Sequence, residues 1–318
     1  MEWRSGNLRF LAVLAFALLG AVVSLAGAAP QQVRSESGPK PANKSKDKVK
    51  KSNFAPEPAG PWSPPDVDAA VPPVESGVSC PLSTVLEKAG ERVKEMVSNL
   101  PKFAATEHMD HAELKPDGTW KDAAPVVFDY LVETHEVRPG MLVMEETRDN
   151  GEALDKFPAR LATKGLPALA LVFHPYFADD FEMRCEGRSN WDGYYAWQVH
   201  FQQRADKLPR LHAYRVKNLA FLLKLKGRAW ISDDNFQVLH IDTDLMEPVP
   251  QVQYFLEHLS VDYRPVEFPK AKEELWLQQR AEAFMDVRGH RYRRVHTFTN
   301  FKLFLVETQE KVTLPKEP

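Results

Sequence analysis

The sequence predicts a mainly β protein of the α+β class, in which one antiparallel sheet has a single apolar face and an amphipathic helix precedes it. Three observations predict this class. Apolar residues recur at helical spacing over residues 82–100, apolar and polar residues alternate in long runs from residue 103 onward, and short turn sequences join consecutive runs. Strands joined by short turns must be antiparallel.

The N-terminus reads as a secretory signal peptide over residues 1–28. Two arginines precede an apolar stretch from Phe10 to Leu25, and Ala26-Gly27-Ala28 has the small-residue pattern of a cleavage site. The alternative is an uncleaved anchor, because a membrane-spanning helix needs roughly 20 apolar residues. Pro30, which cannot continue a helix, favours cleavage. The sequence therefore predicts a periplasmic or otherwise extracytoplasmic protein.

Residues 29–77 are predicted to form a disordered linker rich in lysine and proline, because such a segment has little apolar surface to bury. One domain follows over residues 78–310, and residues 311–318 form a tail. The 41 basic and 44 acidic side chains give a net charge of -3, which argues against nucleic acid as a partner. The linker lysines either stay solvated or contact a membrane surface or another envelope component.

Cys80 and Cys185 are the two cysteines of the sequence. An exported chain with two cysteines most simply forms one disulfide. Closing a loop of about 100 residues contributes up to ~4.7 kcal/mol in the chain-entropy model. The alternatives are two buried thiols or a catalytic cysteine, and neither residue lies in a recognisable nucleophile motif.

Residues 82–100 are predicted to form the amphipathic helix. Its apolar stripe runs from Leu82 to Leu100, Thr84 and Glu87 have the spacing of a capping box, and Pro101 ends it. The stripe must be buried, and the strands that follow are the expected partner.

Strand patterns begin near Phe103. Two hairpins are clearest, 126–136 with 141–148 and 229–232 with 236–244, and longer strands follow over 252–268, 275–287 and 292–308. Alternation places Leu239 and Ile241 on one face and His240 and Asp242 on the other, so one face of the sheet is apolar.

The segment between the two hairpins lacks this alternation. Residues 154–161 predict a short helix that ends before Gly165, and residues 166–173 are almost wholly apolar. The second stretch is either part of the core or a lid over the open edge of a curved sheet.

The order of elements resembles the outer-membrane lipoprotein-carrier and lipoprotein-sorting superfamily. The resemblance rests on Gly227-Arg-Ala-Trp-Ile-Ser-Asp233, on Phe236-Gln-Val-Leu-His-Ile-Asp242 and on Glu274-Leu-Trp-Leu277. It implies an unclosed antiparallel barrel, whose concave apolar side is plugged by helices and in that family receives acyl chains.

An apolar sheet face has to be covered, because soluble monomers expose contiguous apolar patches of only a few hundred Å². If the covering segments leave a slot, a lipid gains about 0.8 kcal/mol for each methylene buried there. If they fill it, the protein is a scaffold. The residues predicted to line the slot are Phe255, Leu259, Val261 and Met285, with Phe173 in the segment that closes it.

The most concentrated basic stretch of the domain contains Arg291, Arg293 and Arg294. These side chains are candidates for binding lipid phosphates or an acidic partner through charge-assisted hydrogen bonds. The alternative is a solvated edge whose positive charge prevents strand-to-strand aggregation.

Signals of enzyme chemistry are sparse, and no phosphate-loop, dinucleotide, nucleophile-elbow or zinc-protease motif occurs. His108 and His111 point to opposite faces if they lie on a strand, so no metal is predicted there. His174 near Asp179 more simply ends the apolar stretch. Four aromatic residues at 191–197 either line a ligand mouth or pack around a turn.

The sequence therefore predicts an exported, non-enzymatic binding protein that holds a lipid or other apolar molecule and uses no cofactor. Two other classes stay open. One is an envelope protein-interaction module without a ligand cavity, and the other is an exported hydrolase or metal enzyme.

Overall fold

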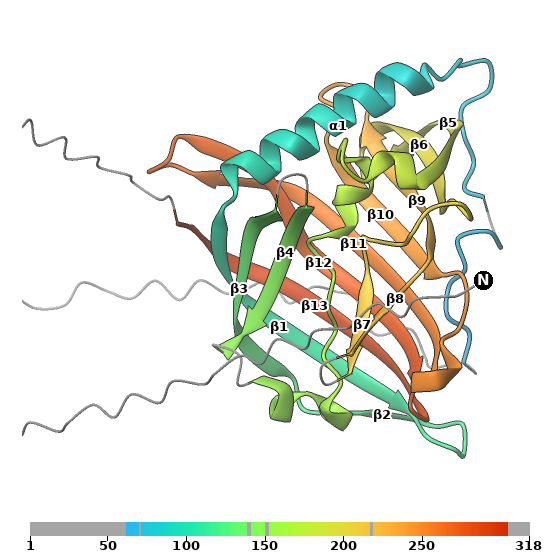
Figure 1. Ribbon diagram of the computed structural model, residues 1–318, viewed down its shortest axis with the longest axis vertical. Coiled ribbons are helices and arrows are strands. Elements are labelled where there is room, and N and C mark those ends of the chain that lie inside the picture. Colours follow the sequence, from blue (N-terminus) through green and yellow to red (C-terminus); the bar gives the residue numbers. More distant parts are fainter. Residues whose placement is uncertain (1–61, 70, 139–140, 150–152, 217–218, 305–318) are drawn as a thin grey trace, which may run out of the picture. The chain divides into compact units, whose positions relative to one another are not determined.

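The computed structural model describes residues 62–69, 71–138, 141–149, 153–216 and 219–304. The predicted signal peptide, the first part of the predicted linker and the predicted tail lie outside these residues. The described chain is mainly β, with one large antiparallel sheet and few helices (Figure 1). The predicted fold class is confirmed.

The large sheet has eleven strands in the order β4-β3-β1-β13-β12-β11-β10-β9-β6-β5, with β2 paired to β1. Over the described residues β4 and β5 each pair on one side only, so the sheet is not closed into a barrel. The strands are β1 (Lys102–Leu114), β2 (Trp120–Asp122), β3 (Val126–Arg138), β4 (Met141–Arg148), β5 (Phe181–Trp191), β6 (Tyr194–Gln203), β9 (Leu225–Ser232), β10 (Val238–Leu245), β11 (Tyr254–Phe268), β12 (Glu273–Val287) and β13 (His290–Leu303). A separate two-stranded sheet contains β7 (Ala213–Val216) and β8 (Leu219–Leu222).

The predicted amphipathic helix is α1 (Leu82–Asn99), which buries Val85, Ala89 and Val93. The predicted capping box is wrong: Pro81 precedes the helix, and no side chain caps it. The reason is that the helix begins two residues before Thr84, which lies inside the first turn. None of the helices in the described ranges is long and apolar enough to cross a membrane.

The apolar stretch at 166–173 belongs to the core. It contains the short 3-10 helix η4 (Leu169–Phe173), whose five residues are all buried. Gly90 of α1 permits close packing of the two helices, since a methyl group there would lie 3.0 Å from the Phe173 carbonyl oxygen. Residues 154–161 form two 3-10 helices, η2 (Ala153–Lys156) and η3 (Pro158–Arg160), in place of the single helix predicted.

One face of the large sheet, here called the core face, packs against α1 and η4. Leu239, Ile241, Leu259 and Val261 lie in this core and are almost fully buried. Phe255 was predicted to share their face but is 50% exposed. An irregularity in the β11–β12 register between Tyr254 and Leu256 interrupts the alternation there.

The opposite face is crossed by residues 62–69 and 71–77, here called the strap, which the sequence places in the linker. Trp62 lies 6.2 Å from the ring of Phe284 on β12, and the Val67 amide donates to Asp244 on β10 at 2.7 Å. Asp68 pairs with Lys226 on β9 at 2.7 Å. Polar contacts to distant strands, which composition does not reveal, therefore hold the strap on this face.

His240 lies on the strap face between two carboxylates, with its ring nitrogens 2.8 Å from Asp242 and 2.8 Å from Asp262. Burial opposes its charge, but the two aspartates outweigh burial and raise the pKa of His240 to about 9. Trp191 stacks on the imidazole with 3.9 Å between ring centroids. The buried imidazolium of His240 therefore contacts side chains from three strands, β5, β10 and β11.

We expect His240→Asn to flatten the dependence of stability on alkaline pH. A raised folded-state pKa contributes stability that is fully present below pH 6.5 and is lost as pH rises through about 9. That contribution is at most about 3 kcal/mol. Urea unfolding below pH 6.5 and above about pH 9 measures this contribution. His108→Asn, at an exposed strand position, is the control. Equal pH slopes in wild type and His240→Asn would contradict the assignment.

Candidate functional site

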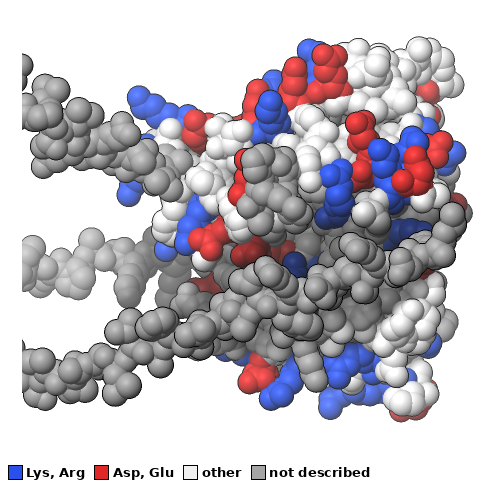
Figure 2. Space-filling model, viewed as in Figure 1, with Lys and Arg blue, Asp and Glu red and all other residues white. Residues whose placement is uncertain are grey.

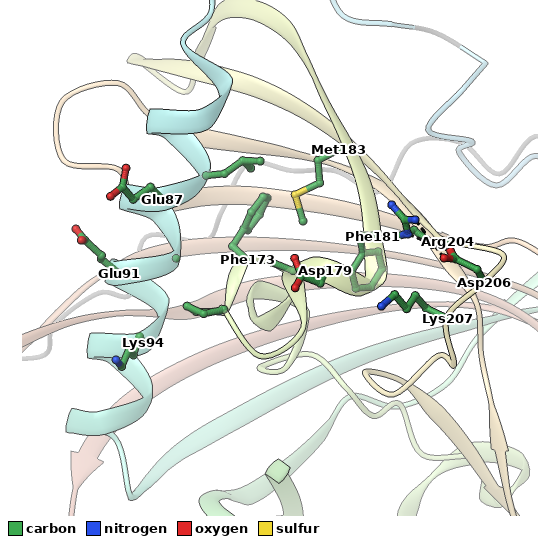
Figure 3. A pocket seen from close by; sticks show the side chains of 14 residues that line it. Glu87, Glu91, Lys94, Phe173, Asp179, Phe181, Met183, Arg204, Asp206 and Lys207 are labelled. Atoms are coloured by element: carbon green, nitrogen blue, oxygen red, sulfur yellow. Dashed lines mark hydrogen bonds and ion pairs between the residues drawn. The ribbon is translucent and has the colours of Figure 1, made fainter. Parts of the chain in front are cut away.

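An open groove of about 860 Å³ lies between α1 and the beginning of β5. Apolar side chains from three elements line it: Leu86 of α1, Phe173 of η4, and Phe181 and Met183 of β5. Figure 3 shows the last three side chains between α1 and the loop that carries Arg204, Asp206 and Lys207. The groove thus has an apolar floor between two secondary-structure walls.

A disulfide joins these two walls. Cys80 lies two residues before α1 and Cys185 lies on β5, with 6.3 Å between their Cα atoms. The predicted pairing is confirmed. The bond fixes the start of α1 beside β5, which sets the separation of the walls at that end of the groove.

The rim of the groove carries both signs of charge. Glu87, Glu91 and Lys94 project from α1, and Arg204 pairs with Asp206 at 3.0 Å on the other side. Acidic and basic side chains are interspersed over the face of the molecule shown in Figure 2. A ligand in the groove would therefore meet an apolar floor and polar groups of both signs at its edges.

The structure places one of the predicted slot residues in this groove. Phe173 lines it, although its side chain is only 2% exposed. Leu259 and Val261 lie deep in the core, and Met285 belongs to a smaller cluster, where its sulfur accepts a hydrogen bond from Tyr292 at 3.1 Å. Phe255 lies apart from the others, at the surface.

The three predicted basic-patch residues do not share one surface. Arg291 pairs with Asp286 at 2.7 Å, and Arg293 pairs with Glu282. Arg294 has no exposed surface and points into the core face. Neighbouring strand residues face opposite sides of a sheet, which explains the separation.

Arg294 belongs to a buried polar cluster, here called the interior network, with Glu107, Arg148, Thr163 and His296. The Arg148 guanidinium donates to Glu107 at 2.9 Å, and His296 lies 2.7 Å from the same carboxylate. Thr163 Oγ1 lies 3.2 Å from His296 and accepts from Arg294 at 3.1 Å. The network therefore ties the loop after η3 to β1, β4 and β13.

Burial alone would raise the pKa of Glu107, but Arg148 and His296 outweigh it and lower the pKa to about 2. Burial, together with the charge of Arg294, lowers the pKa of His111 to about 4. At neutral pH the interior therefore contains a carboxylate and guanidinium groups beside an uncharged imidazole.

The interior network and the groove were not predicted from the sequence. The sequence does contain a signal for the interior network: alternation places Glu107 and His111 on the same strand face as the buried residues Phe103 and Met109. His108 is exposed on the opposite face, as predicted. Of the aromatic residues at 191–197, Tyr194 and Tyr195 are 43% and 54% exposed, while Trp197 is buried.

No protein-family model and no curated protein matches the sequence. Among solved structures, the chain is similar to a DUF1329 family protein from Desulfovibrio piger ATCC 29098, with 12% identity, a TM-score of 0.36, and coverage of 71% of this chain and 94% of that one. It is also similar to a putative outer membrane lipoprotein-sorting protein domain from Vibrio parahaemolyticus, with 10% identity, a TM-score of 0.35, and coverage of 74% and 95%.

Proposed function

We propose that this chain is an exported, non-enzymatic binding protein of the cell envelope that holds a lipid or other apolar molecule in the groove between α1 and β5. The groove itself carries this proposal. Its volume of about 860 Å³ lies within the roughly 300–1,000 Å³ of small-molecule sites, and an apolar floor with polar groups at the rim is typical of such sites.

The disulfide supports both the location and the role. Disulfides persist mainly in oxidising compartments, so the Cys80–Cys185 bond favours an extracytoplasmic protein. The same bond connects the two walls of the groove. A pre-organised site loses less conformational freedom when a ligand binds. A groove whose walls are linked should therefore bind more tightly than one whose helix moves freely.

We expect the purified protein to bind a fluorescent fatty acid and Leu86→Asp to weaken that binding by about tenfold or more. Burying a leucine-sized apolar surface is worth about 1.5–3 kcal/mol, and 1.4 kcal/mol corresponds to a factor of ten. Fluorescence titration gives the dissociation constants. Ser83→Asp adds the same charge on α1 at an exposed position that does not line the groove, and its affinity should match that of the wild type.

Native mass spectrometry after lipid extraction provides the second measurement. Protein that carries no acyl ligand and has no affinity for the fatty acid would exclude the proposed function and favour the interaction module. Equal weakening by Leu86→Asp and Ser83→Asp would place the ligand outside the groove.

A further inference from the structure

The outer edge of β5 is open over its first residues. β5 is the last strand of the sheet and pairs only with β6 among the described strands. The Asp180 carbonyl faces β6, since it accepts a hydrogen bond from the Arg204 amide at 2.9 Å. In an antiparallel pair, the amide and carbonyl of one residue point to one side of the strand, and those of the next residue point to the other side. Because the main chain of Asp180 faces β6, the amides and carbonyls of Phe181 and Met183 point away from β6.

Two residues of β5 supply main-chain groups that have no partner strand on the outer side within the described residues. The Phe181 amide donates to the Ala178 carbonyl at the end of the 3-10 helix η5 (Ala178–Asp180). The Phe181 carbonyl and both main-chain groups of Met183 then remain toward the outer side. An extended chain beside Met183 would satisfy them in the way a further strand does.

The strap shows that this edge accepts an extended chain. Farther along β5, the Glu75 amide donates to the Arg188 carbonyl at 2.7 Å. Val74 packs so closely on Gly187 that a methyl group there would lie 2.8 Å from the Val74 Cβ atom. The strap thus pairs with the edge at Arg188, and none of its described residues has a main-chain hydrogen bond to Met183.

Hollows flank the open part on both faces of the sheet. The groove lies on the core face, and a second hollow of about 490 Å³ lies on the strap face, lined by Asp68, Glu182, Arg184 and His200. Met183 lines both. Successive side chains of a strand point to opposite faces, so a strand added here would place alternate side chains in the groove and in the second hollow.

We propose that β5 binds an extended segment of a partner polypeptide by strand addition at Phe181 and Met183. The groove takes the apolar side chains of that segment, and the second hollow, which charged and polar residues line together with Val71 and Met183, takes the alternating polar ones. Main-chain hydrogen bonds provide affinity and the two hollows select the side chains, as in other cases of strand addition. This goes beyond the proposed function, because it assigns a polypeptide partner to the sheet edge.

The test uses a ten-residue peptide in which leucine and threonine alternate between terminal lysines, added to the full chain. Amide hydrogen exchange followed residue by residue should show the Met183 amide slowed by about tenfold or more, because it acquires a main-chain acceptor. The Glu182 and Arg184 amides, which already face β6, should change far less. The same peptide with N-methylated leucines keeps its side chains but lacks the leucine N–H groups that would donate to the outward carbonyls of β5, and its methyl groups would clash with that edge, so it should neither bind nor protect Met183.

Met183→Pro gives the complementary result from the protein side. It removes the outward amide at an edge position, where proline is tolerated, and should abolish peptide binding, whereas Met183→Ala, which removes the same side chain but keeps the amide, should still bind the peptide. Binding without protection of Met183, equal binding of the N-methylated peptide, or no binding up to about 1 mM, a weak association on the affinity scale, would overturn the proposal. Fatty-acid binding without peptide binding would overturn the strand-addition proposal but not the proposed function.

Discussion

Replacing Glu107 with glutamine is expected to destabilise the protein by about 3–5 kcal/mol, the usual effect of removing one partner from a buried ion pair. Glu107 and Arg148 are almost inaccessible, with 0% and 3% of their side chains exposed. Glutamine has nearly the same shape but no charge, so the Arg148 guanidinium stays buried without its carboxylate. His296 loses the same charged partner.

Urea unfolding at neutral pH measures this effect, and Glu133→Gln is the matched control. Glu133 pairs with Lys102 on neighbouring strands, but about 40% of each side chain is exposed, and exposed pairs contribute about 0–1 kcal/mol. A difference of less than about 1 kcal/mol between the two variants would contradict this expectation, because it lies below the usual effect of breaking a buried pair.

The same substitution should change the acid limb of the stability curve. The pKa of Glu107 is lowered from 4.5 to about 2. A lowered folded-state pKa contributes stability that is present above the unfolded-state value and is lost as pH falls through the folded-state value. Wild type should therefore lose stability between about pH 4.5 and 2 more steeply than Glu107→Gln.

Local patterns in the sequence predicted the helices and strands whose formation depends on residues close together in the chain. The helix at 82–100 has a continuous apolar stripe, and the long strands alternate, so their existence and type followed from spacing alone. The disulfide followed from the count of cysteines and the predicted export. These predictions need no knowledge of which strand pairs with which.

The features that sequence reasoning missed depend on contacts between distant residues. Glu107 meets Arg148 across 41 positions and His296 across 189, and no local pattern reports either distance. The register irregularity beside Phe255 reverses a face that strict alternation assigns. The groove needs the topology as well, since Leu86 and Met183 become neighbours only once α1 lies beside β5.

Replacing both cysteines with serine is expected to lower the free energy of unfolding by about 2–5 kcal/mol. The bond joins residues 105 positions apart. A cross-link that closes a long loop restricts the unfolded chain more than one that closes a short loop. Urea unfolding of the oxidised wild type and the double variant gives the difference, and mass spectrometry of non-reduced tryptic peptides verifies the bond in the wild type. A difference below about 1 kcal/mol would contradict the expectation, since it falls outside the usual range.

The bond should also act on the folded protein, at the start of α1. No side chain caps this helix, so the covalent link at Cys80 is one of the restraints that keep its first turn beside β5. If the link acted only through the unfolded chain, amide exchange in α1 and in β13 would accelerate by the same factor in the double-serine variant. We expect the amides of the first turns of α1 to accelerate more than those of β13, because the helix then frays from an end that no side chain caps. Equal acceleration would show that the disulfide stabilises the protein without shaping the groove.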